Sequence, residues 1–86
     1  MRLRERDRVA SCDPLVRRFP EYEFAIRRLC LRDPEFRAVC DDYGEVQRAL
    51  EQATDRGAPE RAAEYRQMLE ELAAEALACM NALRGV

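Results

Sequence analysis

The sequence has no histidine and no tryptophan among its 86 residues, and all fifteen of its basic residues are arginine. Without histidine the chain cannot build a Ser-His-Asp or Cys-His nucleophile system, or the Glu-x-x-His ligands of di-iron helix bundles. Only three glycines occur, and none belongs to a phosphate loop or a Gly-x-Gly-x-x-Gly fingerprint. Carboxylates, thiols and guanidinium groups remain, and thin helical proteins seldom form the pocket that catalysis needs. We therefore expect no enzymatic activity, no cofactor, and no catalytic or metal-binding residue.

Long apolar runs are also missing. No window is long and apolar enough to span a bilayer, and no charged-then-apolar leader opens the chain. We expect a cytoplasmic, bacterial-type protein with no membrane partner. A hydrophobic content of 48% with only four prolines indicates a folded helical chain. A chain of this length forms one small domain at most.

The four cysteines form no Cys-x-x-Cys pair, and their spacing matches no zinc template. They are Cys12, Cys30, Cys40 and Cys79. In a reducing cytosol we expect free thiols, because disulfides are rare there. Cys40 and Cys79 lie on or beside apolar helical seams, where cysteine packs as a small hydrophobe, and Cys30 should pack in the same way. Cys12 is the candidate for a reactive thiol, so a thiol or metal sensor is a third class of function to weigh.

Charge is divided unevenly along the chain. Residues 1–32 hold nine arginines against five acidic residues, whereas residues 33–86 hold six arginines against twelve. The absence of lysine fits either a GC-rich genome or a need for guanidinium geometry at phosphate or carboxylate partners, and composition leaves both readings open. The possible phosphate contacts are Arg2, Arg4, Arg6, Arg8, Arg17 and Arg18.

Residues 1–12 are expected to form a flexible arginine-rich arm, because they contain no apolar stripe to bury. The arm could bind nucleic-acid phosphates, with an affinity set by counterion release. Acidic residues interrupt the basic ones, however, and no aromatic side chain is present for base stacking. The alternative is that the arm neutralises the acidic region of its own chain or of a neighbouring one.

Helix punctuation divides residues 13–86 into segments of a single helical domain. Asp13 and Pro14 should open a short turn over residues 14–18, with Asp13 as the N-cap, and Pro20 prevents its extension. The sequence then predicts helices at about 20–31, 34–56 and 59–84. Asp33 caps the second of these, and Gly57 follows its end in a left-handed conformation.

Apolar residues recur at steps of three and four along both long segments, which is the pattern of a helical seam. The short connection after Gly57 forces these two helices to pack antiparallel. The expected fold class is all-α, a coiled-coil-like antiparallel helical hairpin preceded by a short N-terminal helix. The acidic group at Asp41, Asp42 and Glu45 is interpreted as a solvated helix face, although it could hold a hard cation if a second helix added oxygens.

Two long helices and one short one should leave part of the apolar stripe uncovered in so small a chain. A homodimeric bundle would cover it, and a different protein partner docking on the same stripe is the alternative. The expected packing and interaction anchors are Tyr22, Ile26, Phe36, Tyr43, Leu69 and Leu72.

The stretches "EYEFAIRRL" and "RDPEFRAVCDDYGEVQRAL" resemble the YdcH-like family of small bacterial helical-hairpin proteins. The matching features are Ile26 and Leu29 in the first stretch, Asp33 with Phe36 three residues on, and Tyr43 before an acidic-apolar segment. The resemblance covers about a third of the chain. It implies a two- or three-helix hairpin, and it carries no assigned activity and no catalytic residue.

These observations predict a non-enzymatic, small helical module for protein interaction and oligomerisation. The alternative function is an RNA- or DNA-binding accessory protein that uses the arginine-rich arm.

Overall fold

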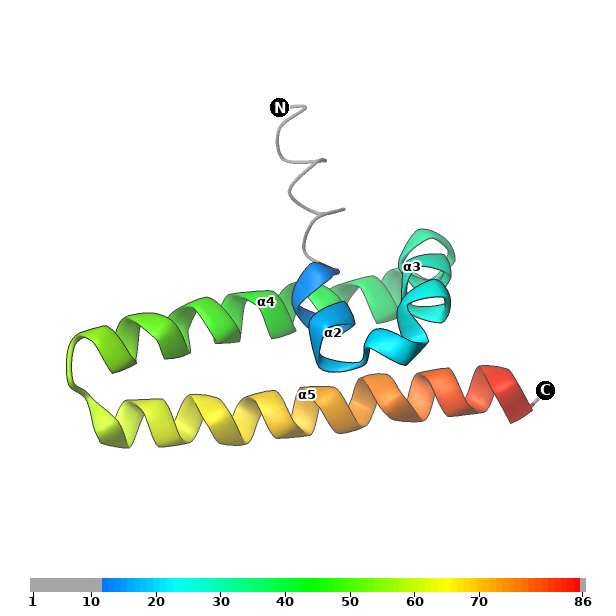
Figure 1. The fold of residues 1–86 in the computed structure, drawn as a ribbon. Helices are drawn as coiled ribbons and strands as arrows, with labels where there is room; N and C mark the ends of the chain where they lie inside the picture. The colour runs from blue at the N-terminus through cyan, green and yellow to red at the C-terminus, as the bar shows by residue number, and fades with distance from the viewer. Residues whose placement is uncertain (1–11, 86) are drawn as a thin grey trace, which may run out of the picture.

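The computed structural model describes residues 12–85, and Figure 1 shows them as a series of helices. In chain order the elements are α2 (Asp13–Arg18), the 3-10 turn η1 (Pro20–Tyr22), α3 (Glu23–Arg32), α4 (Pro34–Asp55) and α5 (Pro59–Gly85). The long helices α4 and α5 run antiparallel, and α2, η1 and α3 lie beside the N-terminal half of α4. The predicted all-α fold with an antiparallel helical hairpin is confirmed, and α2, η1 and α3 precede the hairpin where one short helix was expected.

The junction between α3 and α4 consists of one extended residue, Asp33. Its Oδ1 accepts hydrogen bonds from the backbone N–H groups of Glu35, at 3.0 Å, and Phe36, at 3.3 Å. Pro34 occupies the first helical position, where a missing N–H costs nothing. The predicted N-cap at Asp33 is confirmed, and it allows α4 to turn away from α3 directly after the break.

The start of the domain differs from the prediction in two ways. Asp13 is the first residue of α2 and caps nothing; its Oδ1 accepts a hydrogen bond from Arg27 Nη2 at 3.2 Å. The helix expected from residue 20 begins only at Glu23, because the chain first passes through η1. Phe19, with φ −125° and ψ 69°, stops α2, and the N–H of Tyr22 bonds back to its carbonyl at 2.9 Å.

The turn between α4 and α5 follows the predicted glycine signal. Gly57 has a positive φ of 72°, the left-handed conformation that glycine adopts without strain. The N–H of Ala58 donates to the carbonyl of Ala53 at 2.9 Å, and that of Gly57 to Thr54 at 3.1 Å, which together form a Schellman motif. This motif fixes the short connection that places α5 alongside α4.

One hydrophobic core joins all four helices. Each contributes a fully buried side chain: Leu15 from α2, Ile26 from α3, Phe36 from α4 and Met80 from α5. The short N-terminal segment therefore covers the hairpin more completely than its length suggested, because the turn at residues 14–18 is helical and inserts Leu15.

This packing changes the role of the expected anchors. Ile26, Phe36, Tyr43 and Leu69 are buried within one copy, and Tyr22 and Leu72 are partly buried against the same core. They hold the single chain together, and the apolar stripe that was expected to be left over is covered mostly by α2 and α3. Among the described residues, the large hydrophobic side chains that remain exposed are Phe24, Leu31 and Met68.

Candidate functional site

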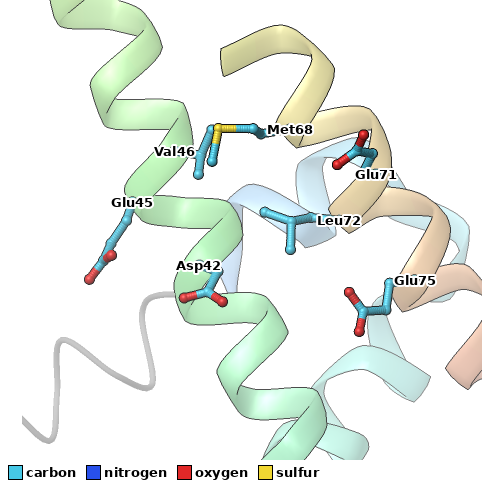
Figure 2. Close-up of a pocket in the computed structure, with 7 residues that line it drawn as sticks. All are labelled: Asp42, Glu45, Val46, Met68, Glu71, Leu72 and Glu75. Carbon is cyan, nitrogen blue, oxygen red and sulfur yellow. The ribbon is translucent and has the colours of Figure 1, made fainter. Parts of the chain in front are cut away.

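A pocket of about 360 Å³ opens between α4 and α5 (Figure 2). Its residues come from little more than one turn of α4 and about two turns of α5. They are Asp42, Glu45 and Val46 of α4, and Met68, Glu71, Leu72 and Glu75 of α5. We call this set the acidic pocket, because four of its seven residues carry carboxylates, although the Glu45 side chain points away from α5 in Figure 2.

Helical spacing explains why these side chains share one site. Met68, Leu72 and Glu75 follow one another at steps of four and three, so they lie on one face of α5. In Figure 2, Met68 extends from α5 toward Val46, and Leu72 points into the space between the helices. The floor of the acidic pocket is therefore apolar.

The rim of the acidic pocket is negative and without internal compensation. Among the side chains of residues 12–82, no arginine forms an ion pair with Asp42, Glu45, Glu71 or Glu75. Glu71 accepts one hydrogen bond, from Gln67 Nε2 at 3.3 Å. The acidic pocket thus combines carboxylate groups with an apolar floor, a combination that suits a positively charged group that also carries apolar surface.

A second exposed surface has the opposite charge. Phe24 and Leu31 are each 75% exposed and lie seven residues apart, on the side of α3 opposite the buried Ile26 and Leu29. The guanidinium of Arg28 lies 5.6 Å from the centre of the Phe24 ring, at cation–π distance. We call Phe24, Arg28 and Leu31 the outer face of α3.

Three buried cysteines meet where α2, α3 and α4 come together. Cys12 and Cys30 are joined by a disulfide, and the Sγ atoms of Cys30 and Cys40 are 3.1 Å apart. All three sulfurs lie within 4.8 Å of one another, and we call them the sulfur cluster. The expectation of four free thiols is wrong for Cys12 and Cys30, and it holds for Cys40 and Cys79. Cys12, placed by the sequence on a flexible arm, is 3% exposed and packs in the core.

Neither free thiol is activated. Burial raises the pKa of the Cys40 thiol to about 12, and the negative charge of Asp41 adds to the effect. Burial also raises the pKa of Cys79, with smaller contributions from carboxylates that include those of Asp33 and Glu75. A reactive thiol needs a lowered pKa and access to solvent. Both cysteines therefore favour the protonated form at neutral pH.

Four of the six arginines considered as phosphate contacts, Arg2, Arg4, Arg6 and Arg8, lie outside the described residues. Arg17 is exposed on α2. Arg18 is held within the chain, because its Nη2 contacts Glu70 Oε1 at 3.1 Å, and this hydrogen bond is the main reason why its pKa is raised. A phosphate bound by Arg18 would have to compete with the Glu70 carboxylate of the same chain for the guanidinium.

The sequence predicts only some of the residues that form these sites. The sequence predicts a solvated acidic face at Asp42 and Glu45. Which apolar residues of α5 lie beside them depends on the register of α5 against α4, and no local pattern specifies that register. Phe24 and Leu31 fall outside the buried period of α3, which is a signal that they face solvent. No spacing of cysteines in the sequence indicates the sulfur cluster, because its three cysteines come from separate parts of the fold.

No protein-family model matches the sequence, and comparisons with curated proteins and with solved structures give no significant match. The YdcH-like resemblance stays a prediction. Within residues 12–85, no helix has both the length and the apolar character that crossing a membrane requires.

Proposed function

We propose that the protein is a non-enzymatic interaction module that forms a homodimer by placing the outer face of α3 from one copy in the acidic pocket of the other. The observation that carries this proposal is the complementarity of the two surfaces. One presents two exposed apolar side chains with arginine between them, and the other presents an apolar floor flanked by carboxylates from both helices.

The dimensions of the two surfaces are compatible. Phe24 and Leu31 are about 10 Å apart along the axis of α3, at 1.5 Å per residue. The lining of the acidic pocket on α5 runs from Met68 to Glu75, which is also a separation of seven residues, and Val46 faces Met68 from α4. Full burial of a Phe or Leu side chain contributes about 1.5–3 kcal/mol each, which supports a specific but reversible contact.

Charge favours this arrangement over direct contact between two acidic pockets. A pocket-to-pocket dimer would bring four carboxylates from each copy together, and like charges across an interface are strongly unfavourable. Arg28 on the outer face of α3 supplies the opposite charge. In a two-fold dimer the contact occurs twice, since α3 of each copy meets the pocket of the other, and the assembly closes.

Sedimentation velocity over a micromolar concentration series tests the proposal. We expect the wild-type chain to dimerise, and Phe24→Ala and Leu31→Ala to weaken the dimer about tenfold or more, since central apolar anchors dominate interface energies. Arg66→Glu, a charge reversal at an exposed position outside both surfaces, is the control and should leave the dimer unchanged.

A charge exchange gives the sharper result. Arg28→Glu alone should weaken the dimer, and Arg28→Glu combined with Glu71→Arg should restore much of it, because the pair is again of opposite sign. A wild-type chain that stays monomeric throughout, or a dimer insensitive to Phe24→Ala, Leu31→Ala and Arg28→Glu, would reject the proposal.

Nucleic-acid binding through the arginine-rich arm remains a separate prediction, and no contact among residues 12–85 favours it. It requires an affinity for an RNA or DNA oligonucleotide that falls steeply with salt. Deleting residues 1–11, which keeps Cys12 in the core, should abolish that affinity. Binding that survives the deletion would exclude the arm as the binding element.

A further inference from the structure

We propose that the sulfur cluster, in its reduced form, is a binding site for Zn²⁺ with Cys12, Cys30 and Cys40 as ligands. The inference is independent of the proposed dimer, because the cluster is buried and shares no residue with the acidic pocket or the outer face of α3.

The arrangement of the sulfurs is close to that of a thiolate zinc site. Zn–S bonds of about 2.3 Å in a tetrahedral site place neighbouring sulfurs about 3.8 Å apart. The three Sγ atoms already lie within 4.8 Å of one another, and all three residues are buried. A small outward movement of Cys12 and Cys40 from Cys30 would make room for the ion.

The backbone supports the same conclusion. The Cα atoms of Cys12 and Cys30 are 7.2 Å apart. Disulfides usually join Cα atoms roughly 4.4–6.8 Å apart, so this pair is at or beyond the upper limit. An ion placed between the sulfurs bridges a longer separation than a direct S–S bond does.

Charge at the site favours a divalent ion over a monovalent one. Three thiolates around Zn²⁺ carry a net charge of −1, and the same ligands around Cu⁺ carry −2. The half-buried Arg37 donates from its Nε to the backbone carbonyl of Cys30 at 2.9 Å, which brings one positive charge next to the cluster. The zinc site therefore places one unit less of negative charge in the core than the copper site does, which matters because the Asp41 carboxylate next to Cys40 offsets part of the charge of Arg37.

Formation of the site requires two balanced steps. A dithiol reductant gives two electrons and two protons to the Cys12–Cys30 bond and becomes a disulfide itself. Binding of Zn²⁺ then forms three Zn–S bonds and releases three protons to solvent. The chain has no histidine, so a water molecule or a group from outside the cluster completes the tetrahedron.

A zinc ion would act structurally in this position. It would join the residue before α2, the C-terminal turn of α3 and the first half of α4. These elements are otherwise linked by core packing, by the hydrogen bond of Arg27 on α3 to Asp13 on α2, and by that of Arg37 on α4 to the carbonyl of Cys30 on α3. Ligands from separate elements couple the metal directly to folding.

The test uses the full-length protein, reduced with a metal-free reductant under anaerobic conditions. Zn²⁺ is added, excess metal is removed by gel filtration, and zinc per chain is measured by elemental analysis, with Cu⁺ loaded in a parallel sample. Titration with Co²⁺ then reports thiolate coordination through its charge-transfer and ligand-field absorption. We expect one Zn²⁺ per chain and Co²⁺ spectra of a tetrahedral, thiolate-rich site.

Variants assign the ligands. Each of three substitutions should weaken Zn²⁺ binding by more than about 100-fold: Cys12→Ala, Cys30→Ala and Cys40→Ala. Loss of a residue that only supports a ligand costs up to about 100-fold, so loss of a ligand itself should cost more. Cys79→Ala is the matched control and should bind as the wild type does, because Cys79 is not part of the cluster. Circular dichroism establishes that each variant is helical before its affinity is compared.

Three outcomes would overturn the inference. The reduced wild-type chain could retain no zinc, which needs no variant to interpret. Zinc could bind equally well to folded Cys40→Ala, which would leave a disulfide and a packed thiol as the only role of the cluster. Preferential retention of Cu⁺ over Zn²⁺ would contradict the charge argument.

Discussion

Arg18 on α2 donates from a single nitrogen, Nη2, to both carboxylate oxygens of Glu70 on α5, each at 3.1 Å. The two residues are 52 positions apart in the sequence. Nη1 of the same guanidinium lies 3.5 Å from the hydroxyl of Tyr43 on α4. One side chain of the N-terminal helix therefore reaches both helices of the hairpin.

Replacing Glu70 tests what this ion pair contributes. The Arg18 and Glu70 side chains are 35% and 66% exposed, so Glu70→Gln should lower the free energy of unfolding by only about 0.2–1 kcal/mol. The difference should shrink in high salt, which screens exposed charges. Urea unfolding measures it, with Glu64→Gln, at an exposed position of α5 outside the acidic pocket, as the control. Equal effects of the two variants would show that the pair contributes nothing specific.

Replacing Asp33 tests the cap of α4. Asp33→Ala removes the acceptor of two backbone N–H groups and should lower the stability by about 1 kcal/mol, whereas Asp33→Asn keeps a capping oxygen and should cost a few tenths at most. Asp13→Ala is the comparison, because Asp13 is the first residue of α2 and its side chain caps no backbone N–H group. Thermal or urea unfolding should rank Asp33→Ala as the more damaging change.

A pair of leucines tests whether the core belongs to one copy. Leu15 is fully buried, so Leu15→Ala should cost about 2–5 kcal/mol. Leu31 is exposed, and Leu31→Ala should change the stability by no more than about 0.5 kcal/mol. Unfolding is measured at a protein concentration where sedimentation shows a monomer. A tolerant Leu15 would mean that α2 does not pack as the structure shows.

Alkylation tests the state of the two free thiols in the protein that keeps the Cys12–Cys30 disulfide. Because the pKa of both is raised, the thiolate fraction at neutral pH is low, and each should react more slowly than an unfolded cysteine. The rates should keep rising with pH beyond 9, the value for an unperturbed thiol, since the raised pKa delays saturation. Mass spectrometry of alkylated peptides gives the two rates separately.

Exposure separates the two thiols further. Cys40 is fully buried and Cys79 is only half-buried, so Cys79 should be alkylated first. Urea should abolish the difference. A Cys40 that reacts as quickly as Cys79 in the native protein would show that the sulfur cluster opens readily to solvent.

Local chemistry made much of the fold predictable. The Asp33 cap, the left-handed Gly57 and the seams of the two long helices are signals carried by a few neighbouring residues, and each appears in the structure. The structure of the N-terminal segment was harder to predict from the sequence. Whether six residues form a helix that buries Leu15 depends on the surface it docks against, and that surface is created by residues far away in the sequence.

The candidate sites were harder to predict for the same reason. The acidic pocket needs the register of α5 against α4, and the sulfur cluster needs three elements to converge. Neither is encoded by a motif with fixed spacing. The outer face of α3 was within reach, since Phe24 and Leu31 stand out of phase with the buried residues of that helix.

The Schellman turn at Gly57 also bears on the order in which the chain folds. It brings Ala53 beside Ala58, so packing of the two long helices can begin with contacts between residues that are close in sequence. Such local contacts form quickly. The junction of Arg18 with Glu70 must wait for a much longer loop to close. We expect the C-terminal half to assemble first, with the N-terminal helices docking onto it as the last kinetic step.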